Sequence, residues 1–347
     1  MKILFLGTKK HKGLIGGVVT HTEFMIEGLK ELYPEADIDI FDSAYSSSGR
    51  RLSVYDSLVR ILAWDYLGYD LIYINSSLYF TSLVKLGLIL GRLRHAESKA
   101  SVVVQFHGGD IRRMKRTKKL AIYMFLKDRL DIVSRLRFLT NEQKRQFEVL
   151  FGVAEPTTEK VRNLVSVEDN VEIDSFDNLR VLLLSRLDPG KGIEEFIECA
   201  RLLKDDGRVK FYAAGNGVLR QKLRKASQEL PNFVYSGTVD DVARDALIKS
   251  CNVFCLLSDN EGMPYALLEN MATGNIPIVT GRGAMGEIVL GYSSGLIIPK
   301  SPTALRDALY QLLADPDFAK KLSNCAYGAV KKHYSLKSLR ISLEALV

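Results

Sequence analysis

The chain has 347 residues, of which 47% are hydrophobic and 26% are charged, and this is the composition of a folded globular protein. It excludes a disordered or fibrous protein, and the length predicts two domains. The formal charge of +7 is unevenly distributed, because residues 1–170 hold 26 basic and 20 acidic side chains whereas the remainder holds 22 and 21. A surface that attracts anions is therefore expected in the first half.

Short β-branched runs alternate with helical periodicity along the whole chain, which predicts parallel sheets covered by helices. In the first half the expected strands are Lys2–Gly7, Asp37–Phe41, Leu71–Asn75, Ser101–Phe106 and Leu136–Thr140. In the second half they are Arg180–Ser185, Val209–Ala214, Phe233–Tyr235, Val253–Leu256, Ile276–Thr280 and Gly295–Ile298.

The polar, acidic segment 166–178, SVEDNVEIDSFDN, has neither period and is interpreted as a linker. It divides the chain into an N-terminal domain, residues 1–165, and a C-terminal domain, residues 179–325. Residues 326–347 are predicted to form a helix that packs back on the N-terminal domain, since their apolar side needs a surface to cover it. Two such α/β domains would leave a cleft between the carboxyl ends of their sheets, where open sheets bind ligands.

The cysteines and the amino terminus predict a cytoplasmic protein. No two cysteines form a Cys-x-x-Cys pair, which favours buried thiols in a reducing compartment over disulfides or zinc ligands. The first residues lack the apolar core of a signal peptide, and no apolar run reaches the roughly 20 residues needed to cross a bilayer. The four cysteines are Cys199, Cys251, Cys255 and Cys325.

The most informative segment is SDNEGMPYALLENMATGNIPIVT, residues 258–280. It follows a strand-like run, and Pro264 and Gly274 suit the first turn and the end of a helix. Glu261 then lies in the turn and Glu269 within the helix, and the backbone N–H groups of residues 262–267 suit a phosphate. Charged helix residues usually face solvent, so the spacing of the two glutamates alone favours solvated side chains, and only the surrounding pattern favours a site.

The pattern E-G-M-P-x-A-L-L-E-x-M-A-x-G around these glutamates resembles the E-x7-E motif of the retaining glycosyltransferases of family 4. The resemblance implies the GT-B fold, in which two Rossmann-like domains face each other across a cleft and C-terminal helices return to the first domain. It implies that Glu261 contacts the donor sugar and that Glu269 binds the ribose hydroxyls. The donor-binding residues implied in this segment are Gly262, Met263, Pro264, Tyr265, Ala266, Leu267 and Glu269.

The loop LSRLDPGKG, residues 184–192, is similar to the G-R-L-x-x-x-K-G loop of the family, with Ser185 in place of the usual glycine. Two cations on one loop can bind one diphosphate. The resemblance assigns Arg186 and Lys191 to the donor diphosphate, which they would stabilise as a leaving group. Gly215, at the end of the next expected strand, suits a tight turn or the close approach of the donor nucleotide.

Two segments of the first half combine glycine with histidine. Gly16 and Gly17 open the run GGVVTH, which lacks the G-x-G-x-x-G spacing of an NAD-binding turn and resembles the G-G-x-x-x-H opening of family 4. There a glycine amide would approach the donor phosphate, and His21 is interpreted as a packing residue. His107 follows the strand SVVVQF, and the resemblance implies that it contacts the donor sugar near its 6-position.

Residues 112–119, RRMKRTKK, contain six cations. They predict either a solvated helix start or a surface for anionic lipid headgroups or a phosphate-linked acceptor. Nucleic acid is not expected, because no recognition motif accompanies the charge. The candidates for this membrane or acceptor surface are Arg112, Arg113, Lys115, Arg116, Lys118 and Lys119.

The D-x-D sequence Asp37-Ile38-Asp39 is typical of metal-dependent transferases, but it lies in an alternating strand where both acids share one polar face. We interpret these two residues as structural and expect neither a metal nor a cofactor.

Together these features predict a retaining, metal-independent glycosyltransferase at the inner face of the membrane. It would transfer a sugar from a UDP- or GDP-sugar to a saccharide or a lipid-linked saccharide, in bacterial-type surface polysaccharide or glycolipid assembly. The alternatives are a catalytically silent GT-B subunit that binds a sugar nucleotide, and another GT-B enzyme such as a sugar-nucleotide epimerase.

Overall fold

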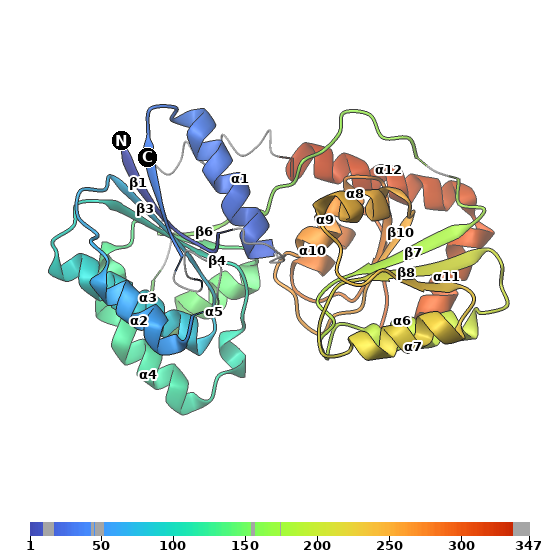
Figure 1. Cartoon of the computed structure of the whole chain (residues 1–347), viewed down its shortest axis with the longest axis horizontal. Coiled ribbons are helices and arrows are strands. Elements are labelled where there is room, and N and C mark those ends of the chain that lie inside the picture. Colours follow the sequence, from blue (N-terminus) through green and yellow to red (C-terminus); the bar gives the residue numbers. More distant parts are fainter. Residues whose placement is uncertain (10–16, 43–44, 46–51, 154–156, 174, 336–347) are drawn as a thin grey trace. The chain divides into compact units, whose positions relative to one another are not determined.

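The computed structural model describes residues 1–9, 17–42, 45, 52–153, 157–173 and 175–335 (Figure 1). The described chain forms two compact units, Met1–Asn163 and the residues from Leu164 onward. Each unit has its own parallel sheet with helices on both faces, so each is an α/β unit in its own right.

In the described part of the first unit, the strands lie in the order β2-β1-β3-β4-β5-β6, and every pair is parallel. Its strands are β1 Lys2–Leu6, β2 Asp37–Phe41, β3 Leu71–Ser76, β4 Ser101–Phe106, β5 Arg135–Phe138 and β6 Thr158–Lys160. Its helices are α1 Gly17–Leu32, α2 Val54–Ala63, α3 Phe80–His95, α4 Arg116–Leu126 and α5 Asn141–Phe151, with short 3-10 helices at Ile111–Arg113 and Lys127–Ile132.

The two faces of the first sheet differ in polarity. Figure 1 shows α1 on one side of the sheet and α2, α3 and α4 on the other. The side under α2, α3 and α4 is apolar, with side chains such as Ile72, Val104 and Phe138 in one buried cluster. The strand residues that alternate with these include the buried polar side chains of Gln105 and Arg137 as well as buried apolar ones such as Phe5, so the opposite face carries the buried polar groups of these strands.

Local sequence explains where the elements begin and end. The β-branched run Val102–Val104 is buried throughout, as expected of a central parallel strand. The Thr140 hydroxyl accepts a hydrogen bond from the N–H of Gln143 and caps α5, which ends at Gly152 in the left-handed conformation.

In the described part of the second unit, the strand order is β12-β11-β10-β7-β8-β9, again with parallel pairs. Its strands are β7 Leu179–Leu184, β8 Val209–Ala214, β9 Phe233–Tyr235, β10 Val253–Leu256, β11 Ile276–Val279 and β12 Leu296–Ile297. Its helices are α6 Ile193–Leu202, α7 Arg220–Glu229, α8 Asp241–Lys249, α9 Tyr265–Met271, α10 Ala284–Tyr292, α11 Pro302–Ala314 and α12 Pro316–His333.

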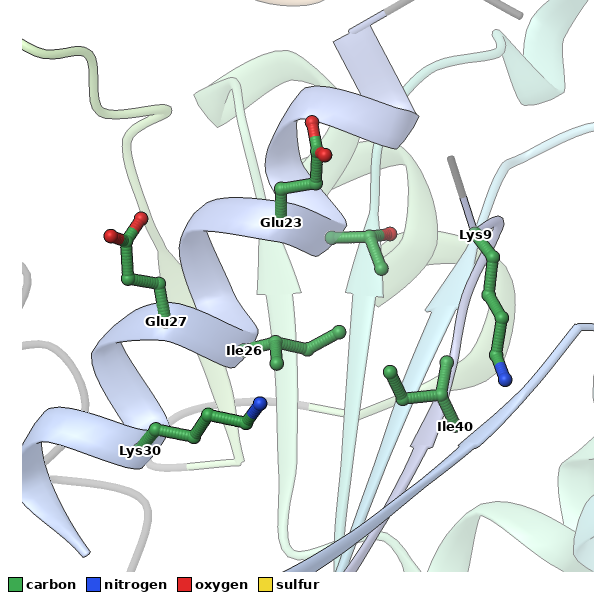
Figure 2. A pocket seen from close by; sticks show the side chains of 7 residues that line it. Lys9, Glu23, Ile26, Glu27, Lys30 and Ile40 are labelled. Atoms are coloured by element: carbon green, nitrogen blue, oxygen red, sulfur yellow. The ribbon is translucent and has the colours of Figure 1, made fainter. Parts of the chain in front are cut away.

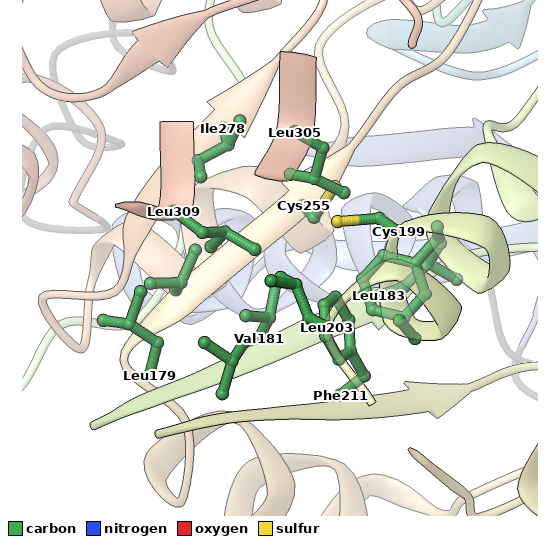
Figure 3. Close-up of a cluster of buried hydrophobic side chains, with 14 of the residues drawn as sticks. Leu179, Val181, Leu183, Cys199, Leu203, Phe211, Cys255, Ile278, Leu305 and Leu309 are labelled. Atoms are coloured by element: carbon green, nitrogen blue, oxygen red, sulfur yellow. The ribbon is translucent and has the colours of Figure 1, made fainter. Parts of the chain in front are cut away.

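One face of the second sheet packs against α6 and α11 through an apolar core, in which Val181, Phe211 and Leu309 are fully buried (Figure 3). Cys199 and Cys255 belong to this core as free thiols, and burial raises the pKa of Cys199 to about 12. Such thiols are protonated at neutral pH and act as small hydrophobic groups, as the sequence predicted.

Every strand expected from the sequence is present, with ends that agree to within two residues. The structure adds β6, whose three residues Thr-Glu-Lys are too short and too polar to give a strand pattern.

The segment expected as a linker, 166–178, lies within the second unit. Phe176 is buried in the core of that unit, and the Asn252 amide donates a hydrogen bond to the carbonyl oxygen of Asn178. Helix α12 also belongs to this unit, where Tyr334 after its end accepts a backbone hydrogen bond from Val165. The residues after Ser335, expected to continue a helix toward the first domain, lie outside the described residues.

No helix in the described part of the chain is both long and apolar enough to span a membrane.

Candidate functional site

In the second unit, the predicted basic loop lies between two neighbouring turns at the carboxyl end of the sheet. The N–H of Leu187 donates to the carbonyl oxygen of Asn216, and the N–H of Asp259 donates to that of Gly190. Gly215 has a packing reason of its own, because a Cβ there would lie 1.9 Å from the Ser185 carbonyl oxygen. The loop is therefore held in place by the turns after β8 and β10.

The structure brings Lys191 and Glu261 together as an ion pair. The Lys191 Nζ atom lies 2.5 Å from Glu261 Oε1, although the two residues are 70 positions apart. The Ser258 hydroxyl donates to the same oxygen at 2.8 Å. Both charged side chains are mostly buried, with 17% and 14% of their surface exposed, so the pair is held in one geometry.

The backbone of Glu261 is also held in place by a glycine for which no sequence motif predicts a role. Gly283 has a φ of +57°, and a Cβ at this position would lie 1.9 Å from the Glu261 carbonyl oxygen. The next N–H, that of Ala284, donates to the carbonyl oxygen of Gly262. Only glycine permits this approach, so Gly283 fixes the turn that carries Glu261.

Arg186 is the exposed member of the basic loop. Its side chain is 76% exposed and its Nη1 atom lies 3.2 Å from Asp188 of the same loop. An exposed pair of this kind costs little to rearrange, so Arg186 is able to reorient toward an anionic ligand.

Helix α9 begins at Tyr265, with Pro264 as its N-cap residue rather than its first helical residue. The side chains of Met263, Tyr265 and Leu267 are buried, and the Leu267 N–H donates to the Pro264 carbonyl oxygen. The side chains of these buried residues therefore stabilise the turn. The N–H of Leu267, predicted from the sequence to face a phosphate, is already used within the turn.

Glu269 on α9 faces Arg244 of α8, with 3.5 Å between its Oε1 atom and Arg244 Nη2. Burial raises the pKa of Glu269, and the charge of Arg244 opposes this effect. A carboxylate held near one cation and largely out of water is suited to accept hydrogen bonds from hydroxyl groups. Arg244 was not identified from the sequence, because nothing in the spacing of α8 and α9 marks the contact.

In the first unit, His107 follows β4 at the carboxyl end of the sheet. Its Nε2 atom lies 2.8 Å from Asn75 Oδ1, at the end of β3, and its ring packs against His21 with centroids 4.3 Å apart. Burial lowers the pKa of His107 to about 3. Burial also lowers the pKa of His21, and the charges of His107 and Arg137 add to that effect, so both rings are neutral at neutral pH.

The glycine pair before α1 is only partly described. Gly17 is the exposed first residue of α1, whereas Gly16 lies outside the described residues. His21 is buried on α1, in agreement with its interpretation as a packing residue, and the side chain that it packs against is the predicted site residue His107.

Two cations of the predicted basic surface are paired with nearby carboxylates. Arg112 donates two hydrogen bonds to Asp110 and pairs with Glu142, while Arg113 lies 3.8 Å from Asp110. Partial burial raises the pKa of Asp110, but the hydrogen bonds from Arg112 outweigh this and hold it below its usual value. Lys118 lies over the Phe80 ring.

The exposed part of this surface is on α4 and just before it. Lys115 and Arg116 are exposed, and Leu120 and Met124 of α4 are 62% and 57% exposed. Arg116, Leu120 and Met124 are spaced by four residues and therefore share one helix face. Tyr123 and Phe125 of the same helix pack against the core instead.

A groove on the first unit lies between α1 and β2 and contains none of the predicted site residues (Figure 2). Its lining combines two cations, two carboxylates, two isoleucines and one threonine: Lys9, Lys30, Glu23, Glu27, Ile26, Ile40 and Thr22. In the part of the chain that the structure describes, no group of three or more His, Cys, Asp or Glu residues is placed to hold a metal ion. Asp39 accepts a hydrogen bond from the Tyr69 hydroxyl and lies 3.6 Å from Lys2, in agreement with a structural role.

Residues 170–329 match the family model described as "Glycosyl transferases group 1". The match extends over most of the second unit, and it confirms the resemblance found in the sequence at the level of group 1 glycosyltransferases. One similar protein is a Campylobacter jejuni enzyme named as an alpha-1,4-N-acetyl-D-galactosaminyltransferase of GalNAc-alpha-(1->4)-GalNAc-alpha-(1->3)-diNAcBac-PP-undecaprenol. The two sequences are 33% identical over 166 residues, and this match covers 46% of this chain and 45% of that relative. The chain spans half or less of the length of the curated relatives that it matches.

Two solved structures are similar over nearly the whole chain. A sucrose-phosphate synthase from Thermosynechococcus elongatus has a TM-score of 0.76 and 17% identity, with 99% of this chain and 98% of that chain covered. The Anabaena protein HepE, in complex with UDP and glucose, has a TM-score of 0.71 and 17% identity, with the same coverage. At this identity the likeness shows the fold alone, and it confirms the predicted GT-B pattern of two Rossmann-like halves.

Proposed function

We propose that the protein transfers a sugar from a nucleotide-diphosphate sugar to a hydroxyl group of a saccharide or lipid-linked saccharide acceptor, in polysaccharide or glycolipid assembly. The observation that carries this proposal is the Lys191–Glu261 ion pair at the carboxyl end of the second sheet. The group 1 domain match supports it, as do HepE, whose structure holds UDP and glucose, and the undecaprenol-linked saccharide in the name of the Campylobacter relative.

In this proposal the second unit binds the donor. A lysine ammonium has three N–H donors. In Lys191 one of them donates to Glu261 Oε1, so two remain for diphosphate oxygens. Arg186 would supply a second cation, and the negative charge that develops on the departing diphosphate would be offset by both. Glu269 would accept hydrogen bonds from the ribose, and Glu261 would contact the sugar.

The retaining outcome, the independence from metal and the role of Gly16, Gly17, Gly215 and His107 toward the donor are parts of the same proposal. They rest on the resemblance to the E-x7-E transferases. His107 is neutral, which suits hydrogen bonding to a sugar hydroxyl better than binding a phosphate.

A thermal-shift screen against UDP, GDP, ADP and their common sugars tests the donor site. A ligand that binds the folded protein raises its melting temperature, by an amount that grows with concentration over Kd. We expect one nucleotide to act at millimolar concentration and to lose its effect in Lys191→Ala, whereas Lys222→Ala, an exposed lysine paired with Glu194, serves as the matched control. No stabilisation by any nucleotide would contradict the proposal, and binding without transfer to any acceptor would favour the silent subunit.

We further propose that the exposed face of α4 contacts anionic membranes and brings the enzyme to its acceptor. Exposed cations beside exposed apolar side chains are the combination that binds a lipid interface. Cosedimentation with vesicles that contain anionic lipid tests this. Replacing Lys115, Arg116 and Lys118 by Gln should reduce binding by up to about 10²-fold, because each cation near an anionic surface contributes roughly 1 kcal/mol. The same number of substitutions on α7, at Lys222, Arg224 and Lys225, is the control, and equal binding of both variants would exclude the contact.

A further inference from the structure

A chain of hydrogen bonds connects α1 to His107 across the carboxyl end of the first sheet. The Thr22 hydroxyl donates to the Val18 carbonyl oxygen at 2.9 Å. Asn75 Nδ2 donates to Thr22 Oγ1 at 3.3 Å, and Asn75 Oδ1 lies 2.8 Å from His107 Nε2.

The direction of these bonds determines which ring nitrogen of His107 carries the proton. A hydroxyl has a single proton, and that of Thr22 is used by Val18, so Thr22 Oγ1 can only accept from Asn75. The Asn75 amide must therefore point its NH2 group at Thr22 and its oxygen at His107. Because a carbonyl oxygen has no proton to give, Nε2 of His107 must be the donor.

The other ring nitrogen is then an acceptor. Burial keeps the His107 ring neutral, so it holds one proton only, and Nδ1 has a free lone pair. The His21 ring, tilted by 60° against that of His107, limits how the imidazole can turn. The turn that follows is fixed as well, since the Leu78 N–H donates to the Gly108 carbonyl oxygen.

We propose that Asn75 is a positioning residue that holds His107 as the Nε2–H tautomer, so that His107 Nδ1 accepts a hydrogen bond from a sugar hydroxyl of the substrate. This inference rests on the proposed glycosyltransferase function for the identity of the ligand, but the tautomer itself does not depend on it. A site that accepts a hydrogen bond from a hydroxyl discriminates against the deoxy analogue, because its acceptor would then be left unpaired.

Nitrogen-15 NMR of the imidazole rings tests the tautomer without any substrate. We expect His107 to show a protonated Nε2 and an unprotonated Nδ1, with its signals assigned by their loss in His107→Gln. Thr22→Ser keeps the hydroxyl and should keep this pattern. Thr22→Val has nearly the same shape without the hydroxyl, so the amide is free to turn and the two tautomers should mix. A wild-type ring protonated on Nδ1 would overturn the inference.

Kinetics with a nucleotide sugar test the second half of the proposal. Thr22→Val and Asn75→Leu should lower kcat/KM by about tenfold, the effect of one hydrogen bond, while the Kd for UDP stays unchanged. Thr22→Ser should retain the wild-type rate. Mixed tautomers with an unchanged rate would show that Nδ1 does not contact the substrate. If no donor supports transfer while the NMR pattern holds, the proposed function fails and the assigned tautomer stands.

Discussion

The carboxyl edges of the two sheets carry different kinds of side chain, although the two units have similar folds. The edge of the first sheet holds neutral groups, His107, His21 and Asn75, whose rings and amide are fixed by burial and hydrogen bonds. The edge of the second holds charged groups in pairs, Lys191 with Glu261 and Arg244 with Glu269. The comparison shows that a parallel sheet places ligand groups at one edge without determining their charge.

The difference matters for what each edge can bind. Neutral imidazole and amide groups suit the uncharged hydroxyls of a sugar. Protonation of the imidazole rings would disturb this arrangement. Ion-paired lysine and glutamate suit a ligand that is itself part anion and part sugar, because an incoming phosphate can share the cation. Substitutions at each edge, with matched controls, therefore separate binding of the sugar hydroxyls from binding of the phosphate.

The largest effect is expected at the Lys191–Glu261 pair. Lys191→Ala should weaken binding of the nucleotide and Glu261→Gln should mainly lower turnover, each reducing kcat/KM by about 10²- to 10³-fold. Because the two groups act on each other, the double variant should lose less than the product of the single losses. Steady-state transfer assays with the nucleotide sugar measure all three variants.

Lys222→Ala is the control for this pair, since its partner Glu194 is also a carboxylate but the pair is exposed. It should remain within about twofold of the wild-type rate. Strictly multiplicative losses in the double variant would mean that the ion pair has no role in transfer.

Burial of neutral His107 at the carboxyl edge of the first sheet should make the stability of the fold sensitive to acid. In the unfolded chain an imidazole gains its proton below its ordinary pKa of 6.5, whereas folded His107 stays neutral down to a pKa of about 3. Stability is therefore complete above the unfolded pKa and is lost as pH falls through this window. For one group the loss is about 2 kcal/mol between about pH 6.5 and pH 5.

Urea unfolding of His107→Gln at these two pH values should show a smaller acid loss than the wild type. His95→Gln, at the exposed end of α3, provides the comparison and should leave the acid loss unchanged. An acid loss in His107→Gln as large as that of the wild type would contradict a buried, neutral His107.

At the carboxyl edge of the second sheet, Glu269→Gln should affect stability and nucleotide binding in opposite directions. Burial raises the pKa of Glu269, so the unfolded chain loses its proton first and the folded state becomes less stable as pH rises from the ordinary value of 4.5. The glutamine variant lacks this loss, and its melting temperature relative to wild type should increase with pH. Its affinity for UDP should fall by about tenfold, the value of a lost hydrogen bond to a charged group. A melting difference that does not vary with pH would argue against a desolvated carboxylate.

The smallest effect on stability is expected at Arg186. Its side chain is exposed and its partner is on the same loop, so Arg186→Ala should change the free energy of unfolding by less than about 0.5 kcal/mol. Its affinity for UDP should nevertheless fall by about tenfold, as expected for the loss of one charge-assisted contact. Calorimetric titration measures the affinity, and an unchanged Kd would remove Arg186 from the donor site.

Several site contacts could not be predicted from the chain because they join distant positions. Lys191 and Glu261 were both singled out by their motifs, yet only the fold shows that they form one pair with Ser258. Arg244 and Asn75 have no motif at all, and Gly283 is one glycine among 26. The prediction of Leu267 as a phosphate-binding amide overlooked a local turn that uses its N–H.

The sequence alone determined the α/β class, nearly every strand and the loops that carry the candidate residues. These features follow from local hydrophobic periods and turn residues, which act over a few positions. Tertiary structure decided how the charges are paired, why Glu269 is desolvated and which tautomer His107 adopts. Those properties depend on burial and on partners up to 70 residues away, and no local pattern encodes them.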